Sequence, residues 1–133
     1  MTTIHLSLTS AIVDIKLNTA LRYNRVRIAQ LSFKNPGTYN SIQLQIPQIG
    51  MRNSFISNGG TYNTTLSIPL VAATDAVTFY SNTDQSSDVW NSSDGAVSSE
   101  KMSIINFTVT VLVDGQLAPV SSLYPVQLVL EFI

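Results

Sequence analysis

The sequence predicts an all-β fold: an antiparallel two-sheet sandwich or barrel of about eight strands, in one domain over residues 1–133. Three observations support this fold class. Apolar and polar residues alternate in successive runs, and a period of two is typical of strands with one buried face. Clusters of Asn, Asp, Gly and Pro separate the runs. No window as long as an ordinary helix keeps a helical period, so no segment requires a helix.

Four strands are predicted in the first part of the chain. The runs Ile4–Leu8 and Val13–Leu17 each place three aliphatic residues on one face and polar residues on the other. The run Tyr23–Phe33 is also typical of a strand, but its apolar residues change face partway, which predicts a β-bulge near Ala29. In Ile42–Ile46, aliphatic residues alternate with glutamines, so the glutamines are expected on the polar face.

Four more strands are predicted in the second part. The run Tyr62–Ile68 alternates throughout, whereas Val71–Tyr80 is the weakest candidate. The polar stretch Ser81–Ser99 separates it from the next run and is expected to form a long loop. The longest alternation is Ile105–Val113, whose apolar residues at every odd position are expected in the core. The run Val126–Phe132 closes the chain.

Turn chemistry agrees with these strands. The triplet Asn58-Gly59-Gly60 lies between two β-like runs and predicts a hairpin. The pair Asp114-Gly115 follows the longest strand, and both residue types accept the positive φ that a tight turn requires.

Composition excludes several function classes. The chain has 133 residues, no cysteine and one histidine, which excludes thiol catalysis and metal sites rich in cysteine or histidine. Charged residues make up only 11%, whereas Ser, Thr, Asn and Gln make up about a third. A net charge of −1 speaks against a nucleic-acid partner. No apolar run is long enough for a transmembrane helix, so no membrane span is expected. An uncharged polar exterior is typical of proteins whose surface is covered by other subunits.

Charge is unevenly distributed along the sequence. Residues 1–66 contain six basic residues and one acidic residue, and residues 67–133 contain one basic residue and seven acidic ones. If the fold separates these charges, neighbouring copies attract each other and assembly is favoured. Ordinary surface charge is the alternative.

The candidate inter-subunit contacts are Arg22, Arg25, Arg27 and Trp90. Arg25 and Arg27 fall on one face of their predicted strand, and Arg22 falls on the other. Three arginines beside Tyr23 could contact phosphate, but pairing with the acidic second half, between subunits or within a sheet, fits the charge balance better. Trp90, the only tryptophan, is expected to anchor an interface or to cover the edge of the sandwich.

No catalytic, cofactor-binding or metal-binding residue is predicted, and the protein is not expected to be an enzyme. Asp84, Asp88 and Asp94 lack the spacing of a calcium-binding loop, and a solvated loop explains them better. Enzymes of the cupin type use several histidines to hold a metal, whereas this chain has only His5. The alternative function is sugar binding, as in a lectin or a fibre tip, supported by these features: Trp90, the Asp-rich loop, Tyr62, Tyr80 and Tyr124.

The end of the chain adds a resemblance. The run Ile105–Val113, the turn Asp114-Gly115, the connection through Pro119 and the final run Val126–Phe132 follow each other in that order. This arrangement resembles the closing strands of single jelly-roll capsid proteins of double-stranded DNA viruses. The opening run, the pair Asn18-Thr19 and the basic, apolar strand that follows are similar to the start of penton and minor capsid proteins of virophages and polinton-like viruses.

The resemblance implies that the antiparallel two-sheet sandwich is a single jelly roll over residues 1–133. It also implies a viral structural protein in the virion, a penton or minor capsid protein. It implies homopentamers at the capsid vertices, with other capsid proteins as partners. It carries over no catalytic residue and no cofactor. The chain is too short for the insertion domain that such pentons often carry, which favours a minimal penton, a minor capsid protein or a cementing protein.

Overall fold

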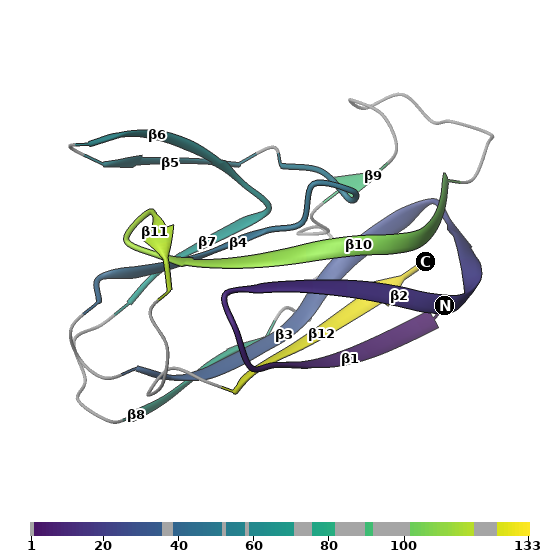
Figure 1. The fold of residues 1–133 in the computed structure, drawn as a ribbon, viewed down its shortest axis with the longest axis horizontal. Coiled ribbons are helices and arrows are strands. Elements are labelled where there is room, and N and C mark those ends of the chain that lie inside the picture. The colour runs from purple at the N-terminus through teal and green to yellow at the C-terminus, as the bar shows by residue number, and fades with distance from the viewer. Residues whose placement is uncertain are drawn as a thin grey trace.

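Two antiparallel sheets face each other in the computed structural model of the chain (Figure 1). The structure describes residues 2–35, 39–51, 53–57, 59–70, 76–81, 90–91, 102–118 and 125–133. Within these residues every regular element is a strand, so the predicted all-β sandwich is confirmed.

The first sheet contains four strands side by side in the order β1 (Thr2–Leu8), β12 (Val126–Phe132), β3 (Arg25–Asn35) and β8 (Ala76–Ser81). A short strand, β9 (Trp90–Asn91), also pairs with β3. The central strand of the second sheet is β10 (Met102–Val113). It pairs with β2 (Ile12–Tyr23), β11 (Gln116–Leu117) and β4 (Ser41–Gln45), and β4 pairs in turn with β7 (Leu66–Pro69).

The order of the strands is consistent with a single jelly roll. The last long strand, β12, lies between β1 and β3, and β10 lies between β2 and β4. The chain passes from β1 to β2 and from β3 to β4 by crossing between the sheets. Sequence neighbours therefore face each other across the core, and each sheet interleaves early and late strands, as in a double Greek key.

The core lies between the two sheets and is almost entirely aliphatic and aromatic. The first sheet contributes Leu6, Leu8, Val26, Ile28, Leu31, Phe33, Val126, Leu128, Leu130 and Phe132. The second contributes Tyr23, Ile42, Leu44, Ile104, Phe107, Val109, Val111 and Val113. Most of them lie on the face that the alternation predicts, because side chains two apart on a strand point the same way.

The predicted β-bulge is confirmed at Ala29. Residues Val129 and Leu130 of β12 pair with Gln30 and Ile28 of β3, so Ala29 has no partner opposite it. The extra residue rotates the strand by one position. Ile28 before the bulge and Leu31 after it can therefore both face the core.

One core assignment is wrong. Ile105 is 43% exposed, and Ile104 is buried in its place. The pairing of β10 with β2 is irregular here: Asn106 lies opposite Lys16, but Ile104 lies opposite Leu21. The irregularity turns the beginning of β10, so the even-numbered residue faces the core there.

Two predicted segments also differ from the structure. The run Tyr62–Ile68 is two strands, because the chain bends at Thr65 and passes from a pairing with β5 to a pairing with β4. The Thr65 hydroxyl donates to the Gly50 carbonyl and accepts from the Ile46 amide, at 2.8 Å each. The predicted loop Ser81–Ser99 contains strand β9, and its other residues after Ser81 lie outside the described residues.

A hairpin forms a third layer on the outer face of the second sheet (Figure 1). It consists of β5 (Asn53–Ser57) and β6 (Gly60–Thr64), as the Asn58-Gly59-Gly60 triplet predicts. Gln43 of β4 was expected on a polar, solvated face but is fully buried. The Gln43 amide nitrogen donates to the Ser41 hydroxyl at 2.8 Å, and its oxygen accepts from the Gly115 amide at 2.9 Å.

The turn between β10 and β11 has the predicted chemistry. Asp114 and Gly115 have φ of 51° and 81°, which fits a two-residue hairpin turn. The Asp114 carboxylate accepts from the Ser41 hydroxyl at 3.0 Å and from the Asn40 amide at 3.1 Å. Together with Gln43, this carboxylate ties β4 to the turn.

Candidate assembly surface

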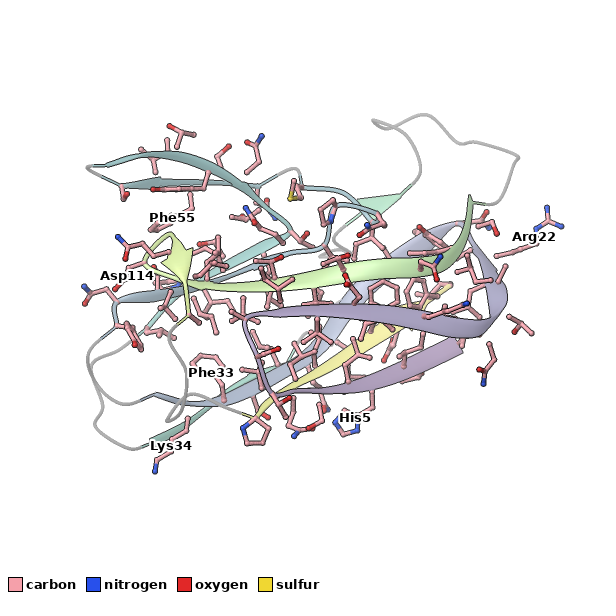
Figure 2. All side chains as sticks on the ribbon, in the orientation of Figure 1. His5, Arg22, Phe33, Lys34, Phe55 and Asp114 are labelled. Carbon is pink, nitrogen blue, oxygen red and sulfur yellow. The ribbon has the colours of Figure 1, made fainter. Side chains whose placement is uncertain are left out.

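Three of the four candidate contact residues lie near the corner where β2 passes into β3. The Ile133 carbonyl accepts the amide hydrogens of Asn24 and Arg25, at 2.8 and 3.0 Å, and fixes this corner. Arg22 is exposed and points away from one end of the molecule, whereas Asp114 lies near the other end (Figure 2). The backbone of Trp90 pairs with Val26, one residue beyond Arg25. The side chain of Trp90 lies outside the described part.

Arg27 lies on the outer face of the first sheet, opposite Glu131 of β12. The two side chains form an ion pair and are only 11% and 17% exposed. Glu131 belongs to the acidic half of the chain, so the pairing within a sheet that the sequence allowed is present here. The buried Arg27 Nε has no hydrogen-bond partner among the described residues.

The ion pair is expected to stabilise the sheet. Glu131→Gln should lower the free energy of unfolding by about 2 kcal/mol, between the cost of breaking an exposed pair and that of breaking a buried one. The reason is that the substitution leaves the largely buried guanidinium of Arg27 without a counter-charge. Urea unfolding at fixed protein concentration measures the effect.

The double variant Arg27→Met, Glu131→Gln serves as the control. It should recover part of the loss, since removing both charges leaves none uncompensated. A Glu131→Gln variant as stable as the wild type would contradict a stabilising ion pair.

Tyr23 and Phe132 form the apolar base of the corner. Their rings meet edge to face, with centroids 5.1 Å apart. Burial raises the pKa of the Tyr23 hydroxyl. The corner therefore has a packed aromatic base, and Arg22 extends from it.

The rest of the described surface is polar and carries a few exposed aliphatic side chains. On the first sheet, Gln127 accepts from the His5 ring at 2.7 Å and donates to the Ser7 hydroxyl at 2.9 Å. On the second sheet, Ile12 is 53% exposed and Leu117 is 54% exposed. They lie opposite Thr110 and Leu112 of β10, so they are neighbours on one face of the sheet's edge.

The described ranges contain no group of three or more His, Cys, Asp or Glu side chains that could hold a metal ion. Other residues considered from the sequence cannot be placed: Asp84, Asp88, Asp94 and Tyr124 lie outside the described residues, as does the side chain of Tyr80. Tyr62 packs beside Phe55 in the hairpin, with ring centroids 6.1 Å apart. It therefore serves packing in the third layer.

Within the part of the chain that the structure describes, no helix is long and apolar enough to cross a membrane. No family model, curated protein or solved structure matches the chain.

Proposed function

We propose that this chain is a viral capsid protein, a penton or minor capsid protein that assembles as a homopentamer at capsid vertices in the virion. The proposal rests above all on the strand order, with β12 between β1 and β3 and β10 between β2 and β4. Viral capsid proteins are a large class of jelly rolls, beside lectins and cupins. Because fold alone does not decide function, the surface has to discriminate among these classes.

The described surface favours a subunit of an assembly over a cupin. The only histidine is His5, which lies exposed on the outer face of the first sheet and bonds to Gln127. Arg22 extends from one end, and Ile12 and Leu117 are exposed at the edge of the second sheet. Arginine and exposed aliphatic side chains among uncharged polar ones are typical of surfaces that another subunit covers.

The mechanism of such a protein is geometric. Each copy presents two different sides to its two neighbours. The copies close into a ring when the rotation that relates neighbouring copies is a whole-number fraction of a full turn. The uneven distribution of charge along the chain supports a contact between unlike surfaces. In this proposal Arg22 and Arg25 lie in the contact and meet acidic groups of the next copy.

Native mass spectrometry over a dilution series tests the proposal. Five chains of 14.5 kDa give a ring of about 72 kDa, which should persist on dilution because obligate interfaces are large. Arg22→Glu is expected to shift the population toward smaller species, whereas Lys34→Glu, at a distance from Arg22 in Figure 2, should leave the ring intact. A monomer at every concentration, or a trimer, would contradict the proposal.

A further inference from the structure

A shallow pocket of about 180 Å³ lies where β2 and β10 run side by side. Its lining residues come from β2, β10 and the turn after β4: Asp14, Ile15, Lys16, Gln48, Asn106, Phe107 and Thr108. The pocket contains none of the residues assigned to the assembly surface.

Four polar side chains form the wall of this pocket in two neighbouring cross-strand pairs. Asp14 lies opposite Thr108, and Lys16 lies opposite Asn106. Residues two apart on a strand share a face, so all four side chains belong to one face of the sheet. Directly opposed side chains in an antiparallel pair start about 4.5–5.5 Å apart at Cβ. The four groups can therefore converge on one small molecule.

Three of the polar side chains that line the pocket are already held in place. The Thr108 hydroxyl donates to Asp14 Oδ1 at 2.8 Å. The Thr108 amide donates to Gln48 Oε1 at 3.1 Å, so Gln48 is fixed at the rim of the pocket. Fixed partners lower the entropy lost when a ligand binds.

The remaining polar groups are available. Asp14 Oδ2, the Gln48 amide nitrogen, the Asn106 amide and the Lys16 ammonium have no hydrogen bond with any described residue. They offer one carboxylate oxygen as an acceptor and several N–H groups as donors. The pocket thus combines donors and acceptors with a net charge of zero from Lys16 and Asp14.

The irregular pairing explains why a depression forms here. Beyond Asn106 and Lys16 the ladder between β10 and β2 breaks, and it resumes only at Ile104 and Leu21. On the other side of β10, strand β4 pairs only from Thr110 onward. The side chain of Gln48 therefore borders β10 at Thr108 where a strand would otherwise lie.

We propose that this pocket binds a neutral polyhydroxylated ligand of about the size of one sugar ring, through Asp14, Lys16, Gln48 and Asn106. Each sugar hydroxyl both donates and accepts, which matches the mixed set of unused groups. An anion would face the Asp14 carboxylate and a cation would face Lys16, so a neutral ligand fits better. The volume lies below the roughly 300–1,000 Å³ of pockets for drug-sized ligands, which limits the ligand to a small ring. The proposal is independent of pentamer formation.

Saturation-transfer difference NMR on the full chain tests this site with D-glucose, D-galactose and D-mannose as separate probes. At least one of them should give a signal that saturates with concentration. Asn106→Ala and Asp14→Asn should each weaken that binding about tenfold, the loss expected for one good hydrogen bond. In Asp14→Asn, the side-chain amide oxygen can still accept the hydrogen bond from the Thr108 hydroxyl, so the local structure should persist.

Asn63→Ala is the matched control, since Asn63 is also exposed on a strand but lies on the hairpin and does not line the pocket. It should bind the sugar as tightly as the wild type. The proposal is overturned if no sugar binds, or if Asn106→Ala binds as the wild type does. It is also overturned if glycine or inorganic phosphate binds in place of the sugars and the two pocket variants abolish that signal, because the site would then recognise charge.

Discussion

Gly115→Val is expected to lower the free energy of unfolding by about 3–4 kcal/mol. Gly115 has a φ of 81°, a conformation that costs a residue with a Cβ about 1–2 kcal/mol. A Cβ at this position would also lie 2.8 Å from Tyr62 Cε2 and 3.2 Å from Phe55 Cε1. Forcing atoms into a packed layer adds about 1–3 kcal/mol. Both effects occur at one residue because the hairpin packs directly on this turn.

Urea unfolding at fixed protein concentration measures this loss. Gly59→Ala is the control, since a Cβ there would meet no atom within 4 Å, and its effect should be within about 0.5 kcal/mol. Combining Gly115→Val with Tyr62→Ala should cost less than the sum of the two, because Tyr62 is the nearest obstacle. A Gly115→Val variant as stable as Gly59→Ala would show that the turn and the hairpin are not packed together.

Most of the long strands of the two facing sheets could be predicted because apolar and polar residues alternate along them. Val126–Phe132 illustrates this: the burial of β12 alternates without exception, and its bounds agree with the predicted run. The bulge at Ala29 was predictable for the same reason, since a change of face within a strand requires an extra residue. In both cases the physical cause lies within the strand and so leaves a pattern in its sequence.

Features that depend on another element could not be predicted in the same way. Gln43 alternates with Ile42 and Leu44 and was therefore assigned to solvent, yet it is fully buried. Its polarity reflects hydrogen bonds to Ser41 and Gly115, which only the three-dimensional arrangement supplies.

The candidate sites show the same limit. The charge asymmetry between the two halves suggested that the arginines pair with later residues, but only the register of β3 against β12 selects Glu131 for Arg27. The pocket was missed because Asp14, Lys16 and Asn106 looked like ordinary polar positions of alternating strands. The unequal lengths of β2 and β4 beside β10 leave room for the pocket, but the predicted runs Val13–Leu17 and Ile42–Ile46 are equally long, because strand lengths follow from pairing.

Gln43→Glu is expected to destabilise the protein by about 3–5 kcal/mol at neutral pH, the cost of an uncompensated buried charge. Gln43 is fully buried, and its amide nitrogen donates to the hydroxyl of Ser41, with a longer contact of 3.5 Å to that of Ser67. A carboxylate cannot donate, and the Ser41 hydroxyl already donates to Asp114. The new charge would therefore lie without a donor from Ser41, close to a second carboxylate.

The dependence on pH separates this charge effect from a simple loss of packing. Burial raises the pKa of a carboxyl at position 43 above its value in the unfolded chain, so the unfolded state ionises first as pH rises. Relative to the wild type, the variant should be nearly unaffected by charge below about pH 4.3 and should lose stability steadily above it. Gln43→Leu should cost about 1–3 kcal/mol at every pH, because it leaves the buried Gly115 amide without an acceptor but adds no charge.

Gln45→Glu provides the matched control on the same strand. Gln45 is half-buried and donates to the Asn63 carbonyl at 2.8 Å, so water can solvate a carboxylate there. The loss should be about 1 kcal/mol, with little dependence on pH above 5. If Gln43→Glu and Gln45→Glu lost equal stability at neutral pH, position 43 would be accessible to water. A large loss confined to Gln43→Glu and growing with pH requires that water is excluded from position 43, where the turn at Gly115 packs on β4.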